Sequence, residues 1–187
     1  VQVSFVKPEN FADIRDRSAM SLEAANREIY RLLKDGIPVS VPDREHGGQK
    51  TERLRVVVDG EVIAETTSGF RVLETAGAPV YYVPPADVRM DRLVASSHGS
   101  FCEWKGPAAY YSYVGPRRRI DDVAWSYAAP SRGYERIAGY LAFYAGRVDE
   151  AWVGDEQATP QPGEFYGGWV TSRIVGPIKG EPGSFGW

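Results

Sequence analysis

The sequence predicts a mainly β protein, α+β overall, in which one helix precedes a domain of antiparallel strands. From residue 54 onward, short aromatic or β-branched runs with a period of two are separated by Gly, Pro, Asp or Ser, as in strands joined by turns. Before residue 54, one segment instead repeats its apolar residues at helical spacing. Hydrophobic residues make up 43% of the 187-residue chain and aromatics 12%, which is enough to build a core. The length suits one domain, alone or with an appendage.

The predicted helix covers residues 21–34, SLEAANREIYRLLK. Ser21 can cap its first turn, and Gly36 can stop it just past the last. Its apolar residues fall on one helical face: Leu22, Ala25, Ile29, Leu32 and Leu33.

A short strand and a linker are predicted to follow this helix. Residues 37–41, IPVSV, are typical of a strand, and Pro38 confines it to a sheet edge because proline has no N–H to donate. The polar stretch PDREHGGQKTE at 42–52 contains a Gly-Gly pair and is the best linker candidate. We therefore divide the chain into an N-terminal extension, residues 1–52, and a β domain, residues 53–187.

The β domain is predicted to begin with a hairpin. In LRVVVDGEVIAET, residues 54–66, two β-branched runs meet at Asp59-Gly60, a pair favoured in tight turns. Further strands are expected at 70–74, 80–83, 100–104, 109–114, 123–127, 140–144 and 150–154, with a helical turn near 134–138. The C-terminal stretch is rich in Gly and Pro but contains Trp169, Phe185 and Trp187, so we expect it to pack back on the domain.

Charge and cysteine content exclude several classes of protein. The net charge is −3, with 22 basic and 25 acidic residues, which gives no electrostatic basis for nucleic-acid binding. A single cysteine excludes an internal disulfide and a cysteine-based zinc cluster, and with only two histidines we expect no metal site and no cofactor. No leader and no apolar run of about 20 residues is seen, so we expect no membrane partner and a reduced, cytoplasmic setting.

Many ordered motifs in the β domain resemble a bacterial family known as domain of unknown function 427. They are RVVVDGEVIAETT, RVLET, PVYYVPPADVRMD, FCEWKGPAAYY, AWSY, IAGYLAFYAGRVD and FYGGWVTSRIVGPIKGEPGSFGW. The resemblance covers about residues 54–187 and implies a β-tent-like pair of antiparallel sheets that lean together over a pocket. The family also carries a nucleotidyltransferase label, but the chain has no Gly-Ser pair followed by Asp-x-Asp. Residues 1–57 are similar to the N-terminus of type I restriction-enzyme motor subunits.

The stretch FCEWKGPAAYYSY, residues 101–113, is the leading candidate for a functional site. The resemblance matches its Cys102, Trp104, Lys105 and Gly106. A lysine after a strand tryptophan can place its ammonium at the rim of an apolar pocket, where it can pair with an anion. We therefore expect Trp104, Tyr110 and Trp125 to form aromatic walls beside Lys105, with Cys102 buried behind them. The alternative is that these rings are ordinary core residues and that Lys105 is solvated.

Two acidic residues are expected to join this site. Glu74 and Asp87 lie at predicted strand ends, and the resemblance favours a polar cluster of both with Lys105. Tyr81 and Tyr82 lie between them, and alternation along a strand sends one ring into the core and the other outward. Tyr82 is assigned to the pocket.

The leading functional hypothesis is a small-molecule-binding module, with a small-molecule ligand as the expected partner. One alternative is an enzyme, for which no catalytic residue is assigned. It would be a magnesium-dependent nuclease built on Asp87 with Glu103-x-Lys105, or a nucleotidyltransferase-like transferase that uses Lys105 with Glu74 or Asp87. A cysteine nucleophile at Cys102 with His98 as its base lacks a third member, and a small buried thiol is the simpler interpretation.

A third functional class is a protein-interaction module with an exposed aromatic patch. The arginines at 117–119 are expected to form a solvated hairpin loop, and the two aspartates that follow them blunt any positive field.

Overall fold

The computed structural model describes residues 5–6, 38–40, 52–74, 77–175 and 178–180, and it confirms a mainly β fold with antiparallel sheets. The predicted helix and most of the predicted linker, with the greater part of the restriction-enzyme-like stretch, lie outside the described residues. The elements, in which η denotes a 3₁₀ turn, are β1 (Phe5–Val6), β2 (Pro38–Ser40), β3 (Leu54–Val58), β4 (Glu61–Thr66), β5 (Phe70–Val72), β6 (Val80–Val83), η3 (Pro85–Asp87), η4 (Met90–Arg92), β7 (Leu93–Cys102), β8 (Gly106–Val114), β9 (Arg119–Ser126), η5 (Glu135–Ile137), β10 (Leu141–Phe143), β11 (Glu150–Val153), β12 (Glu156–Gln157), β13 (Thr159–Pro160), β14 (Trp169–Val170) and β15 (Ile174–Val175).

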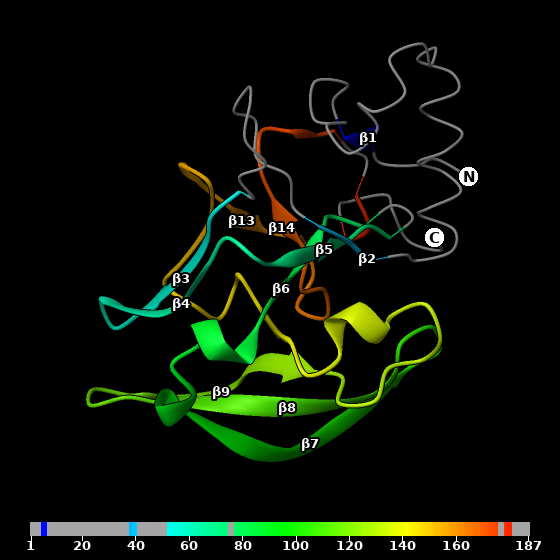
Figure 1. Cartoon of the computed structure of the whole chain (residues 1–187). Helices are drawn as coiled ribbons and strands as arrows, with labels where there is room; N and C mark the ends of the chain where they lie inside the picture. Colours follow the sequence, from blue (N-terminus) through cyan, green and yellow to red (C-terminus); the bar gives the residue numbers. More distant parts are fainter. Residues whose placement is uncertain (1–4, 7–37, 41–51, 75–76, 176–177, 181–187) are drawn as a thin grey trace.

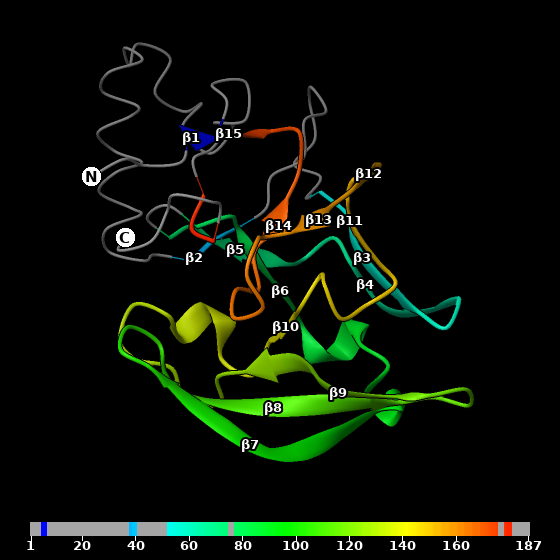
Figure 2. The same ribbon diagram turned by 180° about the vertical axis from the view of Figure 1, so that it is seen from behind.

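The larger sheet has seven strands in the order β2-β5-β6-β10-β9-β8-β7, and its paired strands run antiparallel (Figure 1). β2 lies at one edge, as Pro38 predicts, because an edge strand can accommodate a residue without an N–H. β7, β8 and β9 are long and curve together along the other side of the sheet (Figure 2). β7 and β8 each contain a register shift against the next strand, and such bulges increase local bending.

The smaller sheet has four strands in the order β12-β11-β3-β4. Its β3–β4 hairpin turns at Asp59 and Gly60, whose φ angles are 56° and 75°, so the Asp-Gly signal in the sequence is confirmed. The two-stranded sheets β1-β15 and β13-β14, with an isolated antiparallel bridge between Ala64 and Val88, complete the described pairing.

The core between the two larger sheets is fully apolar at its centre. Its least exposed members come from both sheets and from β14: Leu54, Val56, Val58, Ile63, Val83, Leu141, Phe143 and Trp169. The indole N–H of Trp169 donates to the Phe143 carbonyl oxygen at 2.8 Å, so the C-terminal segment packs back on the domain at this point.

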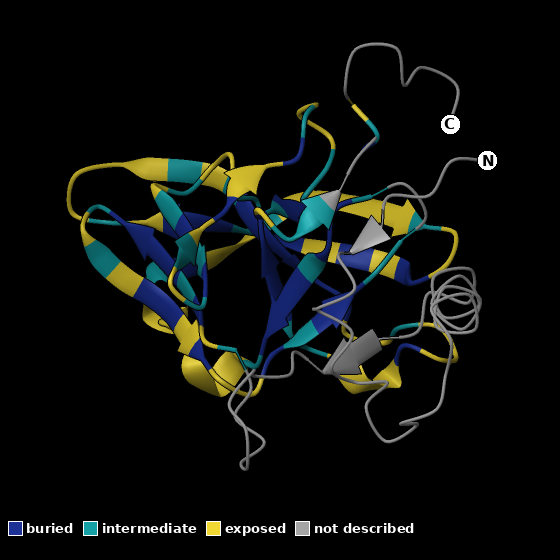
Figure 3. Cartoon of the chain, turned by 90° about the horizontal axis from the view of Figure 1, so that it is seen from above, coloured by how far each residue is buried: buried dark blue, intermediate teal, exposed yellow. Residues whose placement is uncertain are grey.

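The opposite face of the seven-stranded sheet is also covered. Tyr81 belongs to the inter-sheet core and Tyr82 to a second buried cluster, which includes Tyr134 and Ile137 from the segment around η5. The expectation that one of the two tyrosines faces outward is therefore wrong, because another layer covers each face of β6. Viewed from above, buried positions fill the centre of the fold and exposed ones its rim (Figure 3).

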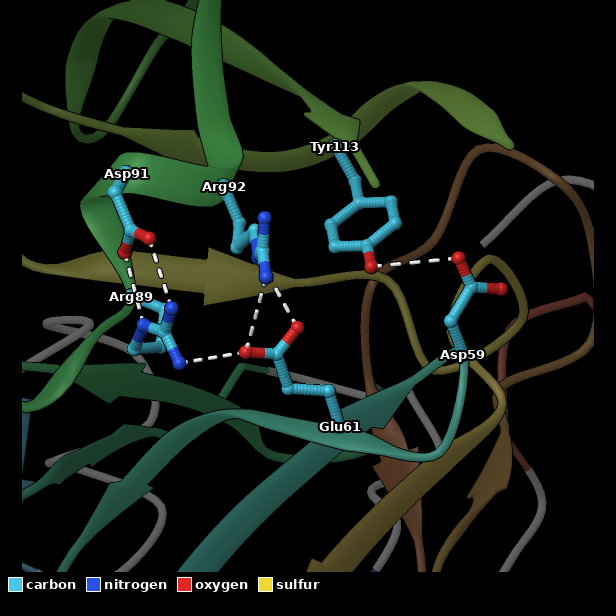
Figure 4. A network of polar contacts seen from close by, with 6 residues as sticks. All are labelled: Asp59, Glu61, Arg89, Asp91, Arg92 and Tyr113. Atoms are coloured by element: carbon cyan, nitrogen blue, oxygen red, sulfur yellow. Dashed lines mark hydrogen bonds and ion pairs between the residues drawn. The ribbon is translucent and has the colours of Figure 1, made fainter. Parts of the chain in front are cut away.

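A polar network joins the β3–β4 hairpin to the connection between β6 and β7 (Figure 4). The figure shows Asp59, Glu61, Arg89, Asp91, Arg92 and Tyr113. Both Arg89 and Arg92 donate to the carboxylate of Glu61, and the Tyr113 hydroxyl donates to Asp59 at 3.4 Å. Because Arg89, Arg92 and Glu61 are partly exposed, we expect their ion pairs to add little to the stability of the fold.

The arginine stretch at 117–119 forms the turn between β8 and β9 and the first residue of β9, as expected for a hairpin loop. Arg118 forms ion pairs with Asp59 and Asp149, so this part of the loop is engaged within the protein. Within the ranges that the structure describes, no helix has the length and apolar character that crossing a bilayer requires.

We expect Trp169→Ala to lower the free energy of unfolding by about 3–5 kcal/mol, because it leaves a large cavity in the inter-sheet core. Trp169→Phe should cost about 1–3 kcal/mol, since it leaves the Phe143 carbonyl without its donor. Urea unfolding would measure both variants, with the exposed Trp104→Ala as a control that should stay within about 0.5 kcal/mol of the parent. Equal losses for Trp169→Ala and Trp104→Ala would contradict the packed position of this segment.

Candidate functional site

A row of side chains crosses one face of the seven-stranded sheet. Cα pairing places Phe70 opposite Tyr82, Tyr82 opposite Ala142, Ala142 opposite Trp125, and Trp125 opposite Tyr110. Residues directly opposite in antiparallel strands share a face, so these rings lie on the same side. Ala142 is the one small member of the row. We infer that its methyl group leaves room between the rings of Tyr82 and Trp125.

A cavity of about 280 Å³ lies over this row. Five of the seven residues assigned to the site from the sequence line it: Glu74, Tyr82, Lys105, Tyr110 and Trp125. The lining also includes Ala78, Val80, Ser100, Phe101, Cys102, Tyr127, Tyr144, Gln161, Phe165, Tyr166, Gly167, Gly168 and Lys179. The structure thus brings together residues from β5 through to the C-terminal segment.

Lys105 is the charged group placed deepest in the wall. Its residue is only 5% exposed, and its ammonium forms an ion pair with Glu74, whose side chain is 45% exposed. The Nζ atom also lies 6.0 Å from the ring centroid of Tyr127 and 5.7 Å from that of Tyr134, within the range of cation–π attraction. The alternative that Lys105 is solvated is therefore wrong.

Local geometry explains why Lys105 points inward and Trp104 does not. β7 ends at Cys102 and β8 begins at Gly106, so residues 103–105 form the turn. Gly106 has φ = 90°, which favours glycine, and the Ser131 N–H donates to the Lys105 carbonyl at 3.1 Å. We infer that these two features orient Lys105.

Trp104 and Asp87 do not line this cavity. Trp104 is 60% exposed. The predicted strand at 100–104 is too long, since β7 ends at Cys102, so alternation along that strand gives the wrong direction for the Trp104 ring. Asp87 lies on η3 and accepts a hydrogen bond of 2.6 Å from the Thr66 hydroxyl, so it ties the β6–β7 connection to β4. The polar cluster is therefore Glu74 with Lys105, without Asp87.

Cys102 is half-buried and lies in the cavity lining itself, instead of behind it. The thiol faces Tyr127, and the pKa of that phenol is raised by burial, with Cys102 and Glu74 adding to the rise. Burial likewise raises the pKa of Tyr82 and of Tyr144 above the usual range. These three phenols, among the five that line the cavity, are therefore protonated at neutral pH.

The Tyr82 hydroxyl is buried and has no hydrogen-bond partner among the residues that the structure describes. The Trp125 indole N–H lies close enough to the Tyr82 oxygen to lower the pKa of that phenol, but the contact does not reach hydrogen-bond geometry, and burial outweighs it. A buried hydroxyl without a partner costs free energy, unless a water or a ligand satisfies it.

The C-terminal segment supplies the side of the cavity that sequence reasoning missed. Gln161 accepts from the Ala78 N–H at 2.9 Å and donates to the Lys179 carbonyl at 3.0 Å, which fixes this segment against the domain. A Cβ at Gly167 would lie 2.1 Å from the Trp125 ring, so the backbone can pass there only as glycine. The adjacent Gly-Gly pair, followed by a buried tryptophan, is the signal in the sequence that could have placed this segment.

A second cavity, of about 470 Å³, adjoins the first and shares Tyr144, Gln161 and Tyr166 with it. Its one basic side chain, Arg147, is exposed and donates to the Asp122 carbonyl. The first cavity is the better candidate because it combines buried rings with a buried charge.

His98 extends the aromatic row toward the sheet edge. Its ring stacks on Tyr110 with centroids 4.2 Å apart, and its Nδ1 lies 2.8 Å from the carboxylate of Asp122. Asp122 has a φ of 50°, an uncommon backbone conformation that Asp and Asn tolerate better than other side chains. His98 is thus engaged with Asp122 and Tyr110, which gives no support to a role as base for Cys102.

We expect Glu74→Gln to destabilise the protein by about 1–3 kcal/mol, because it leaves the buried Lys105 ammonium without its counter-charge. The double variant Glu74→Gln with Lys105→Met should recover part of this loss, since it removes both charges. A double-mutant cycle by urea unfolding measures the coupling. Additive losses would show that the two groups do not interact.

Asp122 should make stability depend on pH at the acid end. Burial raises the pKa of Asp122, but hydrogen bonds from Ser96 and His98 outweigh it, so the folded pKa is lowered. The stability from this group is present above the unfolded value of about 3.9, and it is lost as the pH falls through the folded pKa. Asp122→Asn should flatten this fall in urea unfolding measured from pH 6 to about pH 2.

His98→Gln keeps Asp122 but removes one of its donors, and it should give a pH slope between those of the parent and Asp122→Asn. If the free energy of unfolding of Asp122→Asn fell with pH as steeply as that of the parent, Asp122 would not be the source of the pH dependence.

No curated protein shows significant similarity to the chain. A family model described as a domain of unknown function (DUF427) matches residues 48–154, more than half of the chain. The match includes the aromatic row and the Lys105–Glu74 pair, and it ends before the C-terminal segment that closes the cavity. The chain therefore belongs to the DUF427 family.

Proposed function

We propose that this protein binds a small planar molecule in the 280 Å³ cavity. The observation that carries the proposal is the combination of an aromatic row with a buried lysine at one cavity. Small-molecule sites are concave and mostly apolar, with a few fixed polar groups, and they usually measure about 300–1,000 Å³. A volume just below this range suits a ligand of about one ring. With one cysteine that is free, a reduced compartment such as the cytoplasm is the proposed setting.

The nuclease alternative receives less support. A magnesium site would need Asp87 and Glu103 near Lys105, but Asp87 is bonded to Thr66 and Lys105 to Glu74. In the parts of the chain that the structure describes, no three His, Cys, Asp or Glu side chains gather as metal ligands.

Two exposed rings at the cavity give a clean test of binding. Phe101 and Phe165 line the cavity and are 75% and 83% exposed, so replacing them removes ligand contacts with little loss of stability. Binding would be followed by saturation-transfer NMR with benzyl alcohol, benzoate and benzylammonium as single-ring probes. We expect at least one probe to bind, and Phe101→Ala with Phe165→Ala to weaken that binding by about tenfold.

Trp104→Ala is the matched control. Trp104 is an exposed ring close in sequence to Phe101, but it does not line the cavity, so binding should be unchanged. Loss of binding in Trp104→Ala with none in the other variant would move the site away from this cavity. A failure of every probe to bind would contradict the proposed function.

A further inference from the structure

Resting on the proposed function, we infer that the ligand is a planar, single-ring molecule that carries an anionic oxygen group, a carboxylate of the benzoate type. Three features of the cavity lead to this inference: the sign of its charge, the direction of its hydrogen bonds and its size.

The charge at the cavity favours an anion. Among the described residues, the charged side chains in its lining are Lys105, Lys179 and Glu74, two cations and one anion. Lys105 is nearly buried, whereas the Glu74 side chain is almost half exposed and water can screen it. An ammonium has three N–H donors, and the pair with Glu74 needs only one, so Lys105 can also donate to a ligand oxygen.

The tyrosine hydroxyls in the lining also favour a ligand with an oxygen acceptor. Tyr82, Tyr127 and Tyr144 are neutral phenols, as tyrosine ordinarily is at neutral pH, and burial raises the pKa of each further. A neutral phenol in the lining can donate to an oxygen acceptor, and the Tyr82 hydroxyl makes no hydrogen bond to the described residues. A ligand oxygen near Lys105 and Tyr82 would satisfy a buried group that otherwise costs free energy.

A cationic ligand fits less well, although aromatic cages often bind cations. Lys105 already occupies the cation–π positions against Tyr127 and Tyr134. A second cation would lie beside a buried ammonium, and like charges in a poorly solvated site repel strongly.

The size of the cavity limits the rest of the ligand. A dry cavity of about 150 Å³ can hold benzene. The additional volume here, up to about 280 Å³, accommodates a carboxylate and one or two waters.

The test compares the affinities of benzoate, benzyl alcohol and benzylammonium by NMR titration of the full chain. We expect benzoate to bind about tenfold or more tightly than benzylammonium, since charged hydrogen bonds are the stronger ones. Lys105→Met should weaken benzoate binding about tenfold and leave benzyl alcohol binding nearly unchanged. A purely structural role for Lys105 would weaken both probes alike.

Tyr82→Phe removes one buried hydroxyl and keeps the ring, so it serves as the second variant if Lys105→Met does not fold. It should weaken benzoate more than benzylammonium. Preferential binding of benzylammonium or benzyl alcohol, or a Lys105→Met variant with the parent's benzoate affinity, would overturn this inference and leave the proposed function standing. Absence of binding by all three probes would reject the proposed function together with it.

Discussion

The burial of β6 and β10 on both faces is the constraint on which the rest of the structure depends. Neighbouring residues in a strand point to opposite faces, so a strand with both faces covered has no outward position. Tyr81 therefore packs between the two larger sheets, and Tyr82 packs beneath the cavity. The four-stranded sheet and Trp169 cover one face of these strands. The segment around η5 and the C-terminal segment cover the other face. Whether a residue in these strands contributes to the core or to the cavity depends on which face of the sheet its side chain points to.

The sequence predicts the parts of this arrangement that depend on local interactions. The Asp59-Gly60 turn, the position of Pro38 at an edge and the run of short strands follow from backbone preferences of neighbouring residues. Continuous apolar runs such as VYYV and LAF are also a local signal of two-sided burial, because a half-exposed strand would alternate. The outward direction of Trp104 and the inward direction of Lys105 are not determined by local interactions alone. It depends on where β7 ends and on the Ser131 N–H, which approaches from a distant part of the chain.

The pair of Lys105 and Glu74 connects strands that are far apart in the sheet. Glu74 follows β5, near one edge, and Lys105 follows β7, at the other. An ion pair between them requires the sheet to curl so that its two sides approach each other, and the register shifts in β7 and β8 supply local bending. Burying the ammonium costs solvation free energy, which Glu74 and the rings of Tyr127 and Tyr134 offset in part. The cavity thus lies where the curl of the sheet brings Glu74 and Lys105 together.

The two sides of the cavity have different origins in the chain. The segment matched by the family provides the aromatic row and the ion pair, whereas Gln161, Phe165 and Lys179 come from residues beyond the match. The two sides are fitted to each other, because a single methyl group at Gly167 would collide with the Trp125 ring. The inner wall comes from the matched segment, whereas Lys179, one of the two cations in the lining, comes from the C-terminal segment. The charge that the proposed ligand would meet therefore depends on both segments.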